Sequence, residues 1–437
     1  LSAAGGRDAA ENAAREQKAR ATPGFDEAVA LLQAAVMARA TTVTIERDPK
    51  GMLVRHEVDG VWEKPRVRKP PAHRKEKETF AEAPRPSSES ALAAVDTLAT
   101  LCGLPQARGG RSGTFLLEVD GKPRNGRLSI RVVPGGEQAT VHVDPPPALF
   151  KSPADLGMPA PLAKRLGELL AAEQGLIVIA APPAGGLTTT FDVVVQTADR
   201  LLRDFVSIED AAAPPREIQN VKPVRFDART GVAPLDALAT AMREYPRAIV
   251  TRDLRDHGLA AELARLAVDG QLVIVSMKAA DSLDAMNRLA AHGIEPDTLA
   301  RAVIGSLAQR LVRKLCPKCR EEYPTPGEVL ARLKTTAEKL PRLRKASAHG
   351  CRLCRGTGYL GRTAVFELAS GPTFRQAIAS RADQKLLRQA AVKDGMQPLR
   401  DAAMALVVEG VTSLDELQRA FSATAAARPE ATEAGGK

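Results

Sequence analysis

The chain has 437 residues, enough for two to four domains with their own cores. Charged residues make up 26%, which is ordinary for a globular protein, and no apolar run approaches the roughly 18 residues of a membrane-spanning helix. The formal net charge of +10 is compatible with anionic neighbours, but an aromatic content of 3% leaves little surface for stacking on nucleic acid, which is therefore not an expected partner.

The N-terminal region predicts a tail followed by an α+β domain. Residues 1–24 are polar and Ala-rich, lack a signal-peptide core and read as a disordered tail, which favours the cytoplasm. The chain starts at Leu1 rather than Met, as a fragment or processed form would. The α+β domain spans 25–150, with a helix after residue 28 and a hairpin turning at residues 48–51. Further strands between Phe115 and Val143 are expected to break at turn-forming residues: Asp120-Gly121, Asn125-Gly126 and Pro134-Gly135-Gly136.

Residues 67–90, within this domain, are rich in Arg, Lys, Pro and Ser. Such a composition predicts an exposed basic loop, for which contact with acidic lipid is possible and a solvated surface is the simpler interpretation.

Residues 151–315 alternate short apolar strands with helices, the rhythm of a parallel sheet covered by helices. Strands are expected at Leu176–Ala180, Phe205–Ile208, Ala248–Val250 and Leu272–Ser276, and helices at Thr188–Arg203, Pro234–Glu244 and Leu259–Val268. Ligands of such sheets bind at the carboxyl ends of the strands.

Two CxxC pairs follow, within a predicted zinc-binding subdomain at 316–368. The four thiolates of Cys316, Cys319, Cys351 and Cys354 can complete a closed tetrahedral site, so the predicted role of Zn²⁺ is structural. Two disulfides or a redox pair are the alternatives, which a cytosolic setting disfavours. A helical region is predicted at 369–422 and a second disordered tail at 423–437. The fifth cysteine, Cys102, reads as a small buried apolar residue.

The segment Ala181-Pro-Pro-Ala-Gly-Gly-Leu-Thr-Thr-Thr190 lies between a predicted strand and helix and has the outline of a phosphate loop. Gly185, Gly186, Thr188 and Thr189 fit that template, whereas Leu187 stands where it has lysine. A Gly-rich turn that binds nothing is the competing interpretation.

Several motifs resemble the secretion ATPases that drive type II secretion and type IV pilus assembly. They are Arg288-Leu289, Gly293-Ile294-Glu295-Pro296, the run Leu307-Ala-Gln-Arg-Leu-Val-Arg-Lys-Leu-Cys316, Gly358-Tyr-Leu-Gly-Arg362, Glu367-Leu368, Val58-Asp-Gly-Val61 and Ser129-Ile-Arg-Val-Val-Pro134. The resemblance covers roughly residues 41–417, and its most specific part is Gln309–Cys319, which we expect to be helical.

The resemblance implies a fold: an N-terminal α+β domain, a RecA-like P-loop NTPase-type α/β domain, a four-cysteine zinc subdomain and a helical C-terminal region. It also implies a hexameric ring, with ATP and Mg²⁺ between the first two domains, acting on inner-membrane platform proteins. By position it makes Asp253 and Glu209 the catalytic acids. It makes Gly185, Gly186, Thr188, Thr189 and Arg131 the nucleotide-binding residues.

Departures from the family pattern fall on the chemistry. Besides Leu187, the residue before the Walker B acid is Arg252 rather than Gly, and the two His positions hold Gln271 and Lys278. An expected Arg is Ala239. Three hypotheses remain open: a pseudo-ATPase or scaffold subunit, alone or mixed with an active ATPase paralogue; an active ATPase whose missing cation is replaced by Arg252 or Lys278; and a nucleotide-binding regulatory module without turnover. All three place the chain in the cytoplasm, with peripheral contact to the inner membrane possible.

Overall fold

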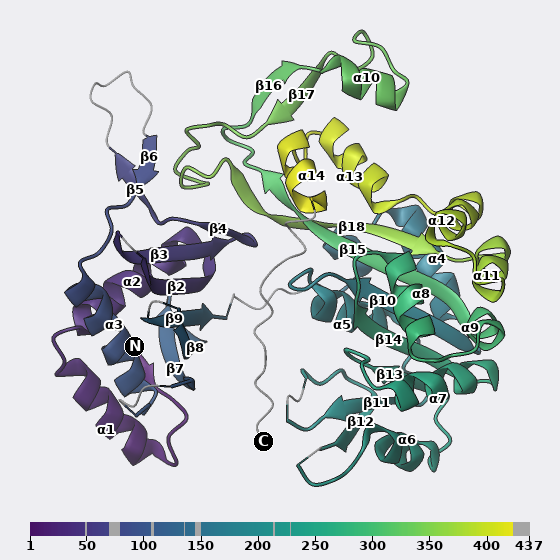
Figure 1. Ribbon diagram of the computed structural model, residues 1–437, viewed down its shortest axis with the longest axis horizontal. Helices are drawn as coiled ribbons and strands as arrows, with labels where there is room; N and C mark the ends of the chain where they lie inside the picture. The colour runs from purple at the N-terminus through teal and green to yellow at the C-terminus, as the bar shows by residue number, and fades with distance from the viewer. Residues whose placement is uncertain are drawn as a thin grey trace. The chain divides into compact units, whose positions relative to one another are not determined.

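The computed structural model describes residues 1–48, 50–69, 79–105, 109–134, 136–144, 150–212, 215–227 and 229–422. The chain divides into two compact units (Figure 1). The first comprises residues 1–148, 315–321 and 346–361, and the second comprises residues 149–314, 322–345 and 362–437.

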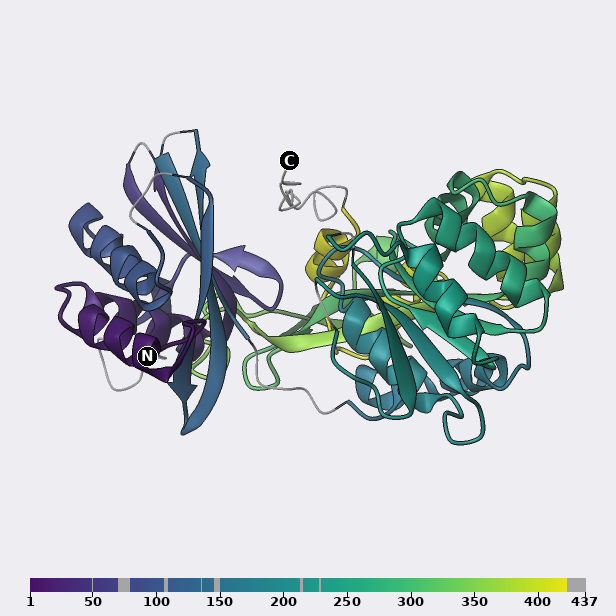
Figure 2. The ribbon, with the colours of Figure 1, turned by 90° about the horizontal axis from the view of Figure 1, so that it is seen from below.

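The first unit is built on an antiparallel sheet in the order β1-β7-β8-β9-β2-β3-β4, with three helices on one face (Figure 2). The strands are β1 (Ser2–Ala3), β2 (Ala40–Asp48), β3 (Gly51–Val58), β4 (Val61–Glu63), β7 (Arg111–Val119), β8 (Lys122–Val133) and β9 (Gly136–Val143). The helices are α1 (Ala9–Arg20), α2 (Phe25–Ala38) and α3 (Ser88–Leu101). Side chains such as Leu32, Leu98 and Ile130 form the core between the helices and the sheet because the strands alternate buried and exposed positions.

Residues 1–24 are not the disordered tail expected from their composition. β1 pairs with β7, and α1 is capped by Asp8, whose carboxylate accepts the N–H of Glu11 at 2.8 Å. Ala19 is fully buried in the core of the first unit, and Arg15 donates to the carbonyl of Cys102 at 3.3 Å. The expectation failed because the buried face of α1 uses alanine, which gives a weak hydrophobic pattern.

Two further expectations for the first unit are corrected. Asn125-Gly126 does not break a strand but lies within β8, where Gly126 faces Phe115 on β7; a Cβ there would come within 2.3 Å of the buried Phe115 ring. The stretch 67–90, expected as a loop, contains the hairpin of β5 (Arg66–Lys69) and β6 (Thr79–Glu82) and the start of α3, while residues 70–78 lie outside the described residues.

The second unit is built on a sheet in the order β12-β11-β13-β14-β10-β15-β18, in which the neighbours from β12 to β15 run parallel. The strands are β10 (Gly175–Ala181), β11 (Phe205–Asp210), β12 (Val221–Phe226), β13 (Ala248–Thr251), β14 (Leu272–Lys278), β15 (Val303–Leu315) and β18 (Tyr359–Ala369). The central strands are continuous apolar runs because both of their faces are covered.

One face of this sheet packs against η1 (Pro153–Leu156), α4 (Ala160–Leu170) and α5 (Leu187–Thr197). The other face packs against α6 (Pro234–Met242), α7 (His257–Val268), α8 (Ser282–Ala291), α9 (Pro296–Ala302) and the C-terminal helices. These are α11 (Pro372–Ala379), α12 (Gln384–Lys393), α13 (Leu399–Val408) and α14 (Leu414–Phe421). A small sheet of β16 (Glu321–Pro324) and β17 (Arg342–Lys345) accompanies α10 (Gly327–Leu333). Within the described residues, no helix is both long enough and apolar enough to span a membrane.

Three segments in the C-terminal part of the chain were expected to have a particular structure: residues 309–319, 316–368 and 423–437. The Gln309–Cys319 motif is not helical: most of it lies in β15, which pairs with β10 in the interior of the sheet. Residues 316–368 do not form one subdomain: the two cysteine turns belong to the first unit and residues 322–345 to the second. The predicted tail at 423–437 lies outside the described residues.

Candidate functional site

The phosphate-loop-like segment joins the end of β10 to the start of α5. Gly185 donates its N–H to the carbonyl of Pro182 at 2.8 Å, which closes a tight turn. Ala184 and Gly186 both adopt left-handed backbone conformations, with φ of 56° and 82°. The segment therefore has the compact shape of a phosphate loop, but the Gly185 amide is already used inside the turn.

The side chain of Gln309, on β15, is hydrogen-bonded to this loop and to α5. Its Nε2 donates to the Gly185 carbonyl at 2.6 Å, and its Oε1 accepts the hydroxyl of Thr190 on α5. A Cβ at Gly186 would approach Gln309 Nε2 to 3.0 Å, so glycine leaves the space that the amide occupies. Sequence reasoning did not assign Gln309 a role, although its position in the most specific motif was the available signal.

Leu187 is the first residue of α5 and packs at the edge of the apolar cluster between α5 and the sheet. Thr188 and Thr189 follow it with exposed side chains. The helix start thus offers backbone N–H groups and hydroxyls but no cation of its own.

Arg252, which follows β13, is the centre of a largely buried charge cluster. Its Nη2 and Nε contact Asp192 Oδ1 at 2.7 and 3.2 Å, and its Nη1 contacts Glu209 Oε1 at 3.4 Å. The three side chains are only 15%, 16% and 7% exposed, and the guanidinium lies 5.1 Å from the centre of the Phe191 ring. Burial raises the pKa of Asp192, and this outweighs the opposing hydrogen bond and charge of Arg252.

Lys278 lies next to the start of the loop, and Asp253 lies near Lys278. Lys278 ends β14, where it is the register partner of Ala181 at the start of the loop. Its Nζ is 4.0 Å from Asp253 Oδ2, which also pairs with Arg255, and 46% of the Lys278 side chain is exposed. Asp253 has a left-handed φ of 50° and donates its N–H to Ser276 Oγ at 3.0 Å. Lys278 is therefore the more accessible of the two substitute cations considered.

Most of the predicted nucleotide-site residues lie on the same side of the second unit, at the carboxyl ends of its strands. The loop, Glu209, Asp253 and Lys278 all stand at the carboxyl ends of parallel strands, where ligands of such sheets bind. Arg131 belongs to the first unit, where it is exposed on β8 beside Gln138 of β9.

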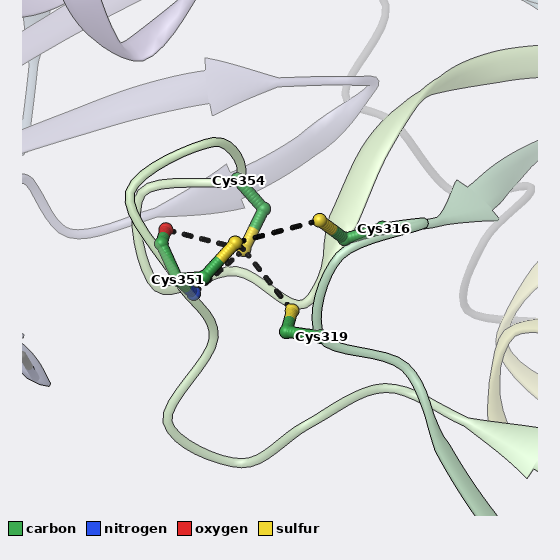
Figure 3. A group of neighbouring side chains, drawn as sticks. All are labelled: Cys316, Cys319, Cys351 and Cys354. Carbon is green, nitrogen blue, oxygen red and sulfur yellow. Dashed lines mark hydrogen bonds between the residues drawn. The ribbon is translucent and has the colours of Figure 1, made fainter. Parts of the chain in front are cut away.

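The four predicted metal-ligating cysteines converge within the first unit (Figure 3). Their sulfur atoms all lie within 4.8 Å of one another, with individual separations of 3.6, 3.7 and 3.8 Å. A zinc ion with Zn–S bonds of about 2.3 Å needs sulfurs about 3.8 Å apart at the corners of a tetrahedron. The N–H groups of Cys351 and Gly358 point to Cys354 Sγ at 3.1 and 3.3 Å, as they would to a thiolate. The donor set fits a closed site for a soft metal ion.

The β5–β6 hairpin contacts the turn that carries the second cysteine pair. Arg66 Nη1 donates to the carbonyl of Gly356 at 2.6 Å, and a Cβ at Gly356 would lie 2.4 Å from the Cβ of Phe80. Gly361 donates its N–H to Asp59 Oδ2 at 3.0 Å. The basic segment that was predicted to be an exposed loop thus supports the cysteine cluster, a long-range contact that composition does not reveal.

Comparison with known proteins gives the family. A family model described as "Type II/IV secretion system protein" matches residues 26–419. The chain belongs to the type II/IV secretion system protein family. The matched range includes the phosphate-loop-like segment and the four cysteines of the cluster.

Individual relatives agree with this family. The chain is 29% identical over 319 residues to the type IV pilus assembly ATPase TfpB of Acinetobacter baylyi, covering 69% of this chain and 54% of that protein. It is 30% identical over 295 residues to the type IV pilus assembly ATPase PilB of Thermus thermophilus, covering 67% and 33%. It is 26% identical over 394 residues to the type II secretion system protein E of Pseudomonas aeruginosa, covering 89% and 74%. The chain thus spans about half of the first relative and a third of the second.

Solved structures share the fold. The Legionella pneumophila ATPase DotB aligns with a TM-score of 0.57 at 16% identity, covering 91% of this chain and 95% of that one. The pilus retraction motor PilT with bound ADP aligns with a TM-score of 0.51 at 17% identity, covering 89% and 95%. At these identities the likeness concerns the fold, and the chemistry of the family's site has to be judged from this chain's own residues.

Proposed function

We propose that this chain is a subunit of a type II secretion or type IV pilus-like assembly whose own phosphate loop does not drive ATP hydrolysis at motor rates. Family membership supports the first part of the proposal. The ion pairs of Arg252, together with Leu187 in the lysine position, support the second. The chain would then act as a scaffold, or as a silent subunit beside an active ATPase paralogue.

Leu187 removes a charge that hydrolysis needs. A phosphate-loop lysine opposes the negative charge that develops on the transferred phosphate. Comparable electrostatic groups contribute about 3–4 kcal/mol each, a factor of hundreds to thousands in rate. Because Leu187 packs against an apolar cluster, its position supplies no such charge.

Arg252 does not replace that charge. Its guanidinium is neutralised by Asp192 and Glu209, and moving it to a phosphate would break both of these largely buried ion pairs, which costs several kcal/mol. The same ion pair occupies Glu209, the acid that the family resemblance assigns to catalysis. The ion pairs of this cluster therefore oppose turnover in two ways: they keep Arg252 from a phosphate, and they occupy Glu209.

A second candidate function, an active ATPase, rests on Lys278. Its side chain is half-exposed and stands next to the start of the loop, and within the described part of the chain its one ion pair is a distant one with Asp253. A bound nucleotide could therefore attract Lys278 at the cost of only this weak ion pair. Binding without turnover is a third possibility, because the start of α5 retains the N–H groups that attract anions at helix N-termini.

For the cysteine cluster we propose structural zinc. Cys316, Cys319, Cys351 and Cys354 would fill all four coordination positions, which leaves none for a substrate. The ion would tie together two turns that are 31 residues apart in sequence and keep them against the β5–β6 hairpin.

The family also supports an assembly proposal. We propose that the chain joins a hexameric ring, with its own copies or with an active paralogue, on the cytoplasmic side of the inner membrane next to platform proteins of the secretion or pilus system. The names of the relatives, which describe type IV pilus assembly and type II secretion, support this setting.

Calorimetry with magnesium-ATP and a hydrolysis assay test the proposal. The native chain is expected to show no turnover above background. Leu187→Lys is expected to gain affinity for ATP, and Leu187→Lys combined with Arg252→Gly to gain turnover as well. Leu187→Met is the matched control because it changes the side chain without adding charge. Turnover by the native chain would contradict the proposal, and its loss in Lys278→Gln would then establish the second candidate.

A further inference from the structure

Large apolar side chains stand exposed on two neighbouring loops of the second unit. Leu201 and Leu202 lie between α5 and β11 and are each 84% exposed, and Tyr245, between α6 and β13, is 85% exposed. The N–H groups of Arg247 and Ala248 both donate to the carbonyl of Asp204, at 3.0 and 3.1 Å, so the two loops are adjacent.

These loops lie at the amino ends of the parallel strands, whereas the phosphate loop lies at the carboxyl ends. Both precede their strands, whereas the phosphate loop follows β10, and the strands are parallel. The exposed residues therefore play no part in the candidate nucleotide site, and whatever covers them acts independently of it.

Tyr245 combines its exposure with an unusual backbone conformation. Tyr245 has a left-handed φ of 52°, a conformation that costs a non-glycine residue free energy. Beside the two loops lies a hollow of about 690 Å³ whose lining includes Leu201, Val221 and Pro246. A hollow of this size accepts several side chains, and exposed apolar residues beside a hollow are typical of protein interaction sites.

Both signs of charge occur around these residues, since Asp199, Asp204 and Glu244 are exposed there, but basic residues are in excess. Arg243 and Arg247 flank Tyr245 and are exposed, and neither guanidinium has a hydrogen-bond or ion-pair partner among the described residues. By contrast, Arg203 is occupied by the carbonyls of Ala171 and Ala172 at 2.6 and 2.7 Å, and Lys222 pairs with Glu244 at 2.5 Å. The cations left for a partner are thus the two arginines beside the tyrosine.

We propose that Leu201, Leu202, Arg243, Tyr245 and Arg247 form a docking surface for an acidic, amphipathic segment of a partner protein. The apolar face of such a segment would cover the leucines and the tyrosine, and its carboxylates would pair with the two arginines. Tyrosine and arginine are the residues that most often dominate binding energy at protein interfaces. An anionic membrane fits less well, since clusters of about 4–8 basic residues are typical of lipid recognition.

A binding assay with a defined probe tests this surface. The probe is a short fluorescent peptide that alternates Glu or Asp with Leu on one helical face, and its control is the same peptide with Lys in place of every acid. Fluorescence anisotropy should show binding of the acidic peptide alone, with an affinity that falls as salt rises. Arg243→Glu combined with Arg247→Glu, and separately Leu201→Ser combined with Leu202→Ser, should each weaken binding at least tenfold.

Matched controls come from the same unit. Arg375→Glu on α11 and Leu386→Ser on α12 alter an exposed arginine and an exposed leucine away from the surface and should leave binding unchanged. Absence of binding, or equal binding by all variants, would overturn the proposal. So would binding to vesicles of anionic lipid, or concentration-dependent self-association, that the surface variants abolish, because the occupant would then be a membrane or a second copy. None of these outcomes bears on ATP turnover, which tests the proposed function separately.

Discussion

Replacing Arg252 with leucine is expected to destabilise the second unit by about 3–5 kcal/mol at neutral pH, because it leaves two buried carboxylates without their cation. The size of this free-energy change follows from burial. The side chains of Arg252, Asp192 and Glu209 are 15%, 16% and 7% exposed, so water can replace little of the electrostatic stabilisation that the guanidinium gives the two carboxylates. An exposed ion pair would contribute at most about 1 kcal/mol. Leucine also removes the guanidinium that lies 5.1 Å from the centre of the Phe191 ring, so the loss includes this cation–π contact as well as the two ion pairs.

The pH dependence supplies a second check on the same variant. The pKa of Asp192 is already raised by burial, although Arg252 opposes this, and removing Arg252 should raise it further. A carboxyl group with a raised pKa in the folded state binds more protons there than in the unfolded chain, so its contribution to stability declines as the pH rises through the raised value. The destabilisation of Arg252→Leu should therefore be full at neutral pH and shrink as the pH falls.

Urea unfolding followed by far-ultraviolet circular dichroism measures the change in free energy, and amide exchange of β11 and β13 locates it. Fluorescence does not serve here, because the one tryptophan, Trp62, lies in the first unit. Arg288→Leu is the control, since its pairing with Asp284 at 3.0 Å is 55% exposed on the arginine side and should contribute little. A change below about 1 kcal/mol in Arg252→Leu would refute the view that this cluster is a desolvated ion pair.

Three further outcomes are expected. His56, 2% exposed, has its pKa lowered to about 4 by burial, so the first unit should lose up to about 3 kcal/mol as the pH falls from 6.5 to 4, and His56→Phe should flatten the dependence measured by Trp62 fluorescence. Native protein should contain one zinc per chain by atomic absorption, whereas Cys351→Ser should contain far less and unfold at lower temperature; equal zinc in both would exclude the cluster as the site. Gly186→Ala should lower urea stability by about 1–3 kcal/mol, because φ is 82° and the new Cβ meets Gln309 Nε2 at 3.0 Å; an unchanged midpoint would show that the loop adapts freely.

The sequence predicted best those elements whose pattern follows from local chemistry. The strand at 272–276 was found because a parallel strand covered on both faces is a continuous apolar run, and the cysteine cluster was found because metal ligation requires paired thiolates. The Gln309–Cys319 motif was assigned to a helix, but its place between β10 and β18 makes most of it a strand, and that pairing depends on residues far away in the sequence. Gly126 was assigned to a turn because Asn-Gly is a common turn dipeptide. The glycine instead leaves space for the ring of Phe115, which comes from another strand and so does not show in the local pattern.

Arg252 could not have been placed from the sequence at all. Its partners, Asp192 and Glu209, come from α5 and β11, which lie 60 and 43 residues away along the chain. A basic residue at a family glycine position suggested a relocated cation, yet the carboxylates that surround it decide its role, and they depend on the packing of three elements.

The shape of the phosphate loop and its capacity to bind phosphate depend on different residues, which is why one can persist without the other. The turn is closed by the Gly185 N–H and the Pro182 carbonyl, and Gln309 and Thr190 fix it to β15 and α5. None of these contacts requires a ligand, so losing the lysine at position 187 leaves the fold of the loop intact. A preserved loop is therefore weak support for nucleotide turnover in this chain, and the measurement that decides it is whether a lysine at position 187, with Glu209 released from Arg252, restores hydrolysis.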